Sequence, residues 1–316
     1  MTEWMIQNRL YDLARQGRRL TPWWGVFVLG SIMLFVSALF GLPVQVVQMA
    51  LAGFSEEGLA AQPPLLAGLF MGLLLAVSFG GLILLVWLWI WLYEKRPFST
   101  LGFERGGALM QYGRGLLLGL LAFGGSVGLM SLFGWVAPEA SDPERVGLAA
   151  LGGILLILLP GWLIQGAAEE VLTRGWMLPV LAARYRPWIG IVFSSFFFAI
   201  MHGLNPNLSL LALVNLMLYG LFAALYALRE ESLWGICAFH SVWNWAQGNL
   251  FGLAVSGQNT GVGTLFDLME TGPDWFTGGA FGPEGGLAVT LVLLLSSALM
   301  VFWPNRRRLL LSEQTS

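Results

Sequence analysis

Long stretches without charge constrain this chain more than any other feature of its sequence. Only 11% of its 316 residues are charged and 57% are hydrophobic, whereas an ordinary soluble domain carries about 25% charged residues. So few charges cannot cover a water-exposed surface of this size. The chain is therefore predicted to be an integral membrane protein. Its 41 glycines and 15 tryptophans agree with close helix packing and interfacial anchoring.

The uncharged stretches predict an all-α, polytopic membrane bundle of about eight transmembrane helices. A helix needs about 20 apolar residues to cross the hydrocarbon core, and these stretches supply that length. The predicted spans are 23–45, 65–93, 115–136, 154–182, 188–203, 208–228, 233–251 and 286–303.

The basic residues predict the orientation of these spans. All but one of the 16 Lys and Arg residues fall on one side of the predicted membrane, and only Arg145 falls on the other. Because basic residues accumulate in cytoplasmic loops, both termini are predicted to be cytoplasmic, and the protein to be a multi-pass protein of the cell (cytoplasmic) membrane. Two compensating errors in the number of spans would give the same alternation.

The same pattern predicts the domain organisation. Residues 1–20 are predicted to form a cytoplasmic amphipathic segment on the inner leaflet, residues 21–304 a single transmembrane bundle, and residues 305–316 a cytoplasmic tail. The net charge of −2 argues against nucleic acid as a partner. The lipid bilayer is the first expected partner.

A small set of polar residues interrupts the predicted spans. An ionised group at mid-membrane costs about 2.5–3.5 kcal/mol on insertion scales, so such groups need partners or a function. The set includes both histidines of the chain and consists of Glu169, Glu170, Arg174, His202, His240 and Asn244. Helical spacing predicts an ion pair between Glu170 and Arg174, and it places His240 and Asn244 on one face of a second helix.

The predicted depths of these residues allow them to meet. At a rise of about 1.5 Å per residue from the cytoplasmic helix ends, Glu169 and His202 lie roughly 20 Å deep, and His240 and Asn244 roughly 10 and 16 Å deep. A carboxylate with an imidazole can deprotonate water and later protonate a leaving amine. A second imidazole and an amide can stabilise an oxyanion. The set therefore suits peptide hydrolysis better than a nucleophilic Cys237 beside His240, because a buried Cys is usually inert.

The same residues resemble the motifs of a known family. Residues 169–174 match EExxxR, residues 198–202 match FxxxH, and residues 240–244 match HxxxN. These are the motifs of the CPBP intramembrane proteases, which include the CAAX-prenyl endopeptidases and bacteriocin-processing and immunity proteins. The resemblance covers about residues 151–252, and the segment 96–102 resembles a common entry segment of the family.

The resemblance implies a role for each residue. Glu169 is the implied general base, His202 its partner in activating water, and His240 with Asn244 the oxyanion-binding pair, while Glu170 and Arg174 support them. Zinc is a candidate cofactor, because His202, His240 and Glu169 would supply three ligands. Asn244 is a poor zinc ligand, so a mechanism with Glu and His alone is favoured.

The predicted function is that of an intramembrane endopeptidase, a metalloendopeptidase or glutamate protease, acting on a membrane-associated peptide or protein. The alternative is a non-catalytic member of the family that binds a membrane peptide or partner, as in bacteriocin immunity or a scaffold. A transporter that uses Glu169 as a proton relay fits less well, since the sequence shows no repeated halves.

Overall fold

The computed structural model describes residues 2–139, 143–152, 154 and 159–302. The predicted tail 305–316 and its residues Arg306, Arg307 and Arg308 lie outside the described residues, as do residues 155–158 of the fourth predicted span. The described chain is mostly helical, and helical runs in it are long and apolar enough to cross a membrane at Trp23–Leu51, Pro64–Glu94, Ala108–Leu132 and Leu210–Glu230. The chain is thus a helical membrane protein. Eight crossings and the orientation of the termini remain predictions.

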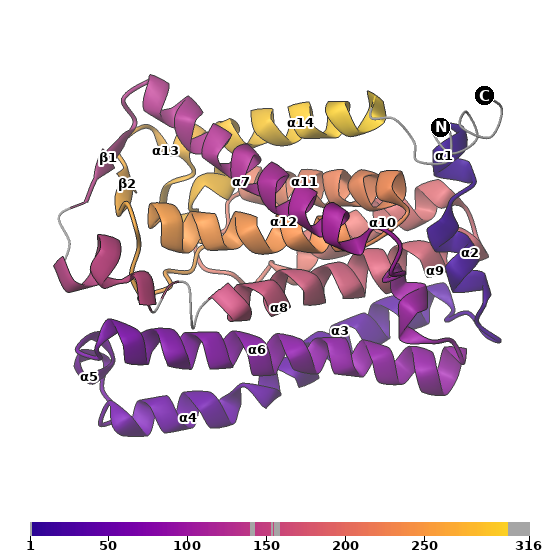
Figure 1. The fold of residues 1–316 in the computed structure, drawn as a ribbon, viewed down its shortest axis with the longest axis horizontal. Helices are drawn as coiled ribbons and strands as arrows, with labels where there is room; N and C mark the ends of the chain where they lie inside the picture. The colour runs from indigo at the N-terminus through magenta and orange to yellow at the C-terminus, as the bar shows by residue number, and fades with distance from the viewer. Residues whose placement is uncertain (1, 140–142, 153, 155–158, 303–316) are drawn as a thin grey trace.

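The first long helices form an antiparallel pair along one side of the molecule (Figure 1). The outgoing run consists of α3 (Trp23–Phe40) and α4 (Leu42–Leu51), and after the short α5 (Glu56–Ala60) the chain returns as α6 (Pro64–Trp89), which ends in a π-helical turn, η1 (Ile90–Glu94). None of the residues of α4 is buried. This helix therefore presents its apolar side chains to the surroundings of the protein, as a helix facing lipid does.

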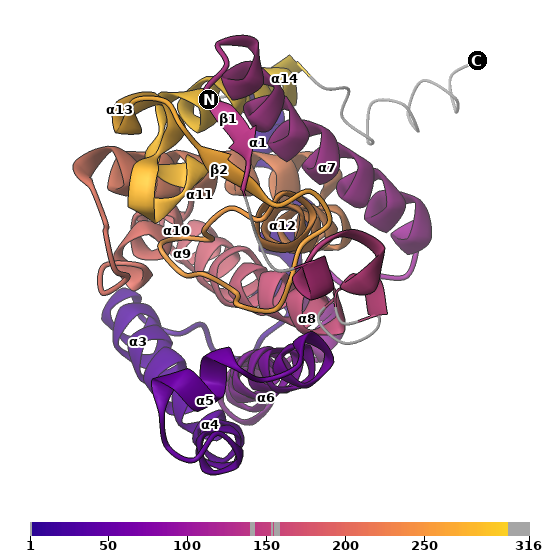
Figure 2. The same ribbon diagram turned by 90° about the vertical axis from the view of Figure 1, so that its left-hand side faces the viewer.

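The remaining long helices form the core around α12. They are α7 (Ala108–Leu132), α8 (Leu159–Glu170), α9 (Leu178–Arg184), α10 (Pro187–Met201), α11 (Leu210–Glu230), α12 (Trp234–Trp245) and α14 (Leu287–Phe302). Two π-helical segments, η6 (Val171–Met177) and η7 (Ala246–Phe251), continue α8 into α9 and extend α12. Figure 2 shows α12 end-on near the middle of the molecule, and all residues from Gly235 to Asn244 are buried.

Small residues bring the helices of this core together. A Cβ atom on Gly119 of α7 would lie 2.6 Å from the carbonyl oxygen of Phe239 on α12. That is closer than real Cβ atoms approach, so only glycine permits this crossing of α7 and α12, as in other membrane helix pairs.

The observed helices follow the predicted spans closely, with one clear displacement. The third predicted span, 115–136, is wrong at both ends, because α7 begins at Ala108 and ends at Leu132. The prediction began after Arg114 because of its charge. In the structure Arg114 lies inside the helix, where its guanidinium forms an ion pair with Glu230.

The end of the molecule that contains the loops after α7 and α12 is not purely helical. Strand β1 (Val136–Pro138) pairs antiparallel with β2 (Leu268–Glu270), a feature absent from the all-α prediction. Short turns complete this end: η3 (Pro143–Arg145), η4 (Gly147–Ala149), α13 (Asp274–Thr277), η8 (Gly279–Phe281) and η9 (Pro283–Gly285).

The N-terminal segment packs on the opposite end of the bundle. It forms α1 (Glu3–Ile6) and α2 (Arg9–Arg15), and the side chains of Trp4, Leu10 and Tyr11 are buried. The Asn8 side-chain amide donates a hydrogen bond of 2.8 Å to the carbonyl oxygen of Leu228 at the end of α11. The amphipathic segment predicted for residues 1–20 therefore buries these apolar side chains against the protein itself.

Candidate active site

The candidate residues meet where α8, α10 and α12 approach one another. Glu169 and Glu170 are the last residues of α8, and His202 caps the end of α10. His240 and Asn244 lie one turn apart on α12. The contact between α8 and α12 is close because Gly166 faces Ser241, where a Cβ atom would lie 2.6 Å from the Ser241 backbone nitrogen. A small residue thus lets the two helices bring their polar side chains together.

The π-helical segment η6 follows Glu170 directly and carries Arg174. The Thr173 hydroxyl donates a hydrogen bond of 2.6 Å to the carbonyl oxygen of Glu169. This hydroxyl also accepts a bond of 2.7 Å from Arg174 Nη1. Because a π-helical turn is wider than an α-helical one and frequently marks a functional site, the local backbone is itself consistent with a site here.

Glu170 organises a fully buried network. Its Oε1 atom lies 3.2 Å from Arg174 Nη1 and 2.8 Å from His240 Nδ1. Arg174 Nη2 also donates to the carbonyl oxygen of Gly220 at 3.0 Å. The predicted ion pair between Glu170 and Arg174 is therefore present, and it also holds the imidazole of His240. With its Nδ1 engaged by Glu170, His240 presents Nε2 to the other side.

Glu169 is placed differently from its neighbour. Its Oε1 atom accepts a hydrogen bond of 2.7 Å from Gln165 Nε2, while Oε2 lies 3.7 Å from His240 Nε2. That distance exceeds the range of a hydrogen bond, and among the described residues the buried Oε2 atom has no hydrogen-bond partner. The carboxylate of Glu169 is therefore buried, and its Oε2 atom can still accept a proton.

Gln165 is a site residue that the sequence interpretation missed. Its Oε1 atom accepts a hydrogen bond of 2.8 Å from Asn244 Nδ2, so its amide bridges Asn244 and Glu169. The available signal was its position four residues before Glu169, on the same face of one helix. Tyr219 was also missed, although its ring centroid lies 5.1 Å from that of His240.

His202 contacts the site through Phe198. Its Nδ1 atom lies 2.8 Å from the carbonyl oxygen of Phe198, and the two ring centroids are 4.9 Å apart. Because a carbonyl oxygen only accepts, Nδ1 carries the proton in this bond, and Nε2 is the basic nitrogen of the neutral ring. The interactions found among the described residues do not join His202 directly to Glu169, its predicted partner.

One cavity connects these side chains. It has a volume of about 760 Å³, and Glu169, His202, His240 and Asn244 all line it. Apolar side chains of α3 and α6, such as Phe35 of α3, form the facing wall. The structure therefore brings the four predicted catalytic residues to one cavity, whereas Glu170 and Arg174 stay in the packed network behind it.

The predicted zinc ligands His202, His240 and Glu169 are not gathered into a metal site. In the described part of the chain, no three His, Cys, Asp or Glu side chains are arranged to hold a metal ion. The Nδ1 atoms of both histidines are bound elsewhere, to Glu170 and to the carbonyl oxygen of Phe198. As arranged among the described residues, these three side chains do not fit a bound zinc ion.

The fold and the site together define a multi-pass helical membrane protein with a carboxylate, two imidazoles and a carboxamide around one cavity. Residues 151–246 match the family model described as type II CAAX prenyl endopeptidase Rce1-like. This match confirms the family resemblance, and the matched segment, which contains all six predicted site residues, belongs to the CPBP (CAAX protease) family of membrane proteases. Comparison with curated proteins gave no match. Comparison with solved structures gave none either.

Proposed function

We propose that the chain is an intramembrane endopeptidase in which Glu169 activates a water molecule for attack on a peptide carbonyl. One observation carries this proposal: a buried carboxylate oxygen, Glu169 Oε2, lies 3.7 Å from His240 Nε2 beside a cavity that His202 and Asn244 also line. A general base must lie within hydrogen-bond reach of the proton that it removes, directly or through one water. A water in the cavity satisfies that condition.

The proposed reaction balances its protons within the site. Glu169 takes a proton from water, whose oxygen forms the bond to the peptide carbonyl carbon, and His202 Nε2 orients the same water as an acceptor. Protonated His240 donates Nδ1–H to Glu170 and offers Nε2–H to the developing oxyanion, with an N–H of Asn244 as the second donor. When the carbon–nitrogen bond breaks, Glu169 returns its proton to the leaving amine.

The proposed substrate is a membrane-associated peptide or protein. The wall of the cavity formed by α3 and α6 includes Phe35, Leu74 and Leu75, and an apolar segment of a substrate would pack there with favourable burial. The polar wall with Glu169 would then face the scissile bond.

The experiment compares membrane peptides in cells that contain the wild type or one of three variants. We expect Glu169→Gln and His202→Ala each to abolish cleavage of the same peptides while the protein still folds and inserts. Glu104→Gln is the matched control, because Glu104 pairs with Arg9 in an exposed ion pair far from the cavity. Full biological activity of both site variants would contradict the proposal and support the non-catalytic binding function instead.

A further inference from the structure

The two ends of the bundle differ in charge. Of the thirteen Lys and Arg residues in the described part of the chain, eleven gather at the end that carries α1 and α2: Arg9, Arg15, Arg18, Arg19, Lys95, Arg96, Arg105, Arg114, Arg184, Arg186 and Arg229. Contacts between distant segments tie this end together. Arg9 pairs with Glu104 at 2.8 Å, and Arg184 Nη1 donates to the carbonyl oxygen of Leu20 at 2.9 Å. We call this the basic end.

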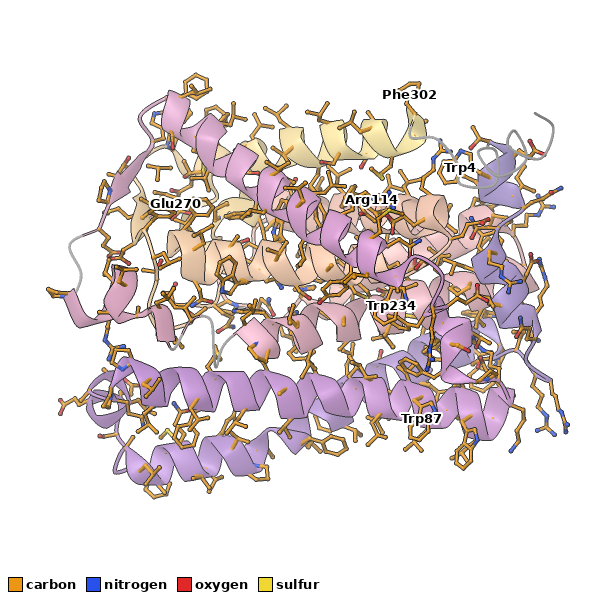
Figure 3. All side chains as sticks on the ribbon, in the orientation of Figure 1. Trp4, Trp87, Arg114, Trp234, Glu270 and Phe302 are labelled. Carbon is orange, nitrogen blue, oxygen red and sulfur yellow. The ribbon has the colours of Figure 1, made fainter. Side chains whose placement is uncertain are left out.

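The opposite end, which contains β1 and β2, is acidic. Figure 3 shows Glu270 there, across the length of the molecule from Trp4. Its other described acidic residues are Glu56, Glu57, Glu139, Asp267, Asp274 and Glu284. The one basic residue described at this end is Arg145, whose guanidinium donates to backbone carbonyl oxygens of Gly261 and Gln62 at 2.8 and 2.9 Å. We call this the acidic end.

The cavity that contains the candidate catalytic residues reaches the acidic end. Its lining includes polar residues of the loops that follow α10 and η7 there: Asn205, Ser256, Gln258, Asn259 and Thr260. Gln258 and Asn259 are exposed. The lining among the described residues contains neither Lys nor Arg, and no residue of α1, α2 or another segment of the basic end.

Packed side chains separate the cavity from the basic end. Behind His240 lies the buried Glu170–Arg174 pair, and beyond it Trp176 is fully buried and donates a hydrogen bond of 3.0 Å to Glu94. Phe222 and Phe239 fill the space beside them, with ring centroids 4.8 Å apart. A peptide would therefore reach Glu169 through the rim at the acidic end or laterally past α3.

Basic residues accumulate on the cytoplasmic side of membrane proteins because translocating them is unfavourable. We propose that the basic end is cytoplasmic, and that the cavity with Glu169 opens to the extracytoplasmic side, so that its substrate is a peptide segment presented from outside the membrane. That this peptide is a substrate rests on the proposed function; the direction in which the cavity opens does not.

The rim also carries a carboxylate. Glu284 lines the cavity, and its Oε2 atom accepts hydrogen bonds of 2.7 Å from both the backbone nitrogen and the hydroxyl of Ser256. No Lys, Arg or His of the described residues forms an ion pair with it.

Cysteine accessibility tests the direction of the opening. The chain has one cysteine, Cys237, which is buried, so Cys237→Ala gives a background without thiols. Asn259→Cys places a thiol on the exposed rim of the cavity, and Arg105→Cys is the matched exposed position at the basic end. Each is treated with a membrane-impermeant maleimide in intact cells and again after permeabilisation, and the total thiol is measured after denaturation.

We expect the Asn259→Cys protein to be labelled in intact cells and the Arg105→Cys protein only after permeabilisation. Labelling of Arg105→Cys alone in intact cells, or of both or neither before permeabilisation, would overturn the proposal. Labelling needs no turnover, so this result is independent of whether the protein is a protease. Loss of cleavage in Glu169→Gln with the opposite labelling pattern would keep the proposed function and reject the extracytoplasmic opening.

Discussion

Two buried glutamates, Glu94 near the basic end and Glu169 in the cavity, differ in how completely their carboxylate oxygens are paired. Glu94 uses both oxygens: Oε1 accepts from the Thr21 hydroxyl at 2.6 Å and from Trp176 Nε1 at 3.0 Å, and Oε2 accepts from Arg96 at 2.7 Å. Glu169 accepts one hydrogen bond from Gln165 through Oε1, and its Oε2 faces His240 at 3.7 Å. Burial alone therefore does not mark a candidate catalytic carboxylate; Glu169 differs from Glu94 by its incomplete pairing and its place beside the cavity.

The largest predicted effect on stability belongs to Glu94. Replacing Glu94 with Ala leaves the buried guanidinium of Arg96 without its carboxylate, and breaking a buried pair on one side costs about 3–5 kcal/mol. Thermal unfolding of the purified protein in detergent measures this loss. Glu104→Ala is the control, since it breaks an exposed pair worth at most about 1 kcal/mol. Equal melting temperatures for the two variants would show that the buried pair of Glu94 and Arg96 does not stabilise the fold.

After the water-activating pair of Glu169 and His202, the largest predicted effect on rate belongs to Asn244. Asn244→Ala removes a proposed oxyanion donor, and loss of one such donor costs about 10²–10³ in kcat. The rate is measured on a peptide found in the cellular comparison. Ser241→Ala is the control on the same helix, because Ser241 bonds to backbone carbonyl oxygens of Leu163 and Cys237. A kcat for Asn244→Ala equal to that of the control would exclude Asn244 from the oxyanion site.

A smaller effect is expected from Gln165, which positions Glu169 and Asn244 without meeting the substrate carbonyl. Gln165→Leu removes a hydrogen bond to a charged group, worth about 1.5–3 kcal/mol. We expect kcat to fall at least about tenfold with little change in KM. An increase in KM at constant kcat would instead assign Gln165 to substrate binding.

The smallest effect concerns the strands at the acidic end. Burial raises the pKa of Glu270 to about 7, with Asp274 acting in the same direction. Because the folded pKa is raised, the protonated form favours the paired strands. This stabilisation is complete below the ordinary value of about 4.5 and is lost as the pH rises through about 7.

Hydrogen exchange of the amides of β1 and β2, corrected for intrinsic rates, measures this effect. We expect less protection in the wild type at about pH 8 than at about pH 5, and little pH dependence in Glu270→Gln, which stays neutral. Equal pH dependence in both proteins would show that another group controls the strands.

The sequence predicts the helices well because their cause is local. Uncharged stretches must be helical in a membrane, where every backbone polar group needs an internal partner, and α10, α11 and α14 follow the predicted spans within a few residues. The pairing of strand β1 with β2 was missed because it joins segments far apart in the chain. Arg114 displaced a predicted span because its partner, Glu230, lies on another helix.

In the candidate site, too, the sequence predicts the contacts within one helix and misses those between helices. The spacing of Glu170 and Arg174 predicts their ion pair, since both lie on one helix. The bridge through Gln165 and the bond between His240 and Glu170 depend on how α8 packs against α12. Nothing in the local sequence distinguishes Glu94, whose partners are Thr21 and Trp176, from a glutamate in a cytoplasmic loop.

The central claim is that Glu169 and Glu170, adjacent in the chain, perform different tasks. The most direct test measures both the cleavage rate and the melting temperature of Glu169→Gln and Glu170→Gln. We predict that Glu169→Gln lowers the rate by at least about 10²–10⁴ at an unchanged melting temperature. Glu170→Gln lowers the melting temperature, because Arg174 loses its buried carboxylate. Cleavage by Glu169→Gln at the wild-type rate would contradict the account.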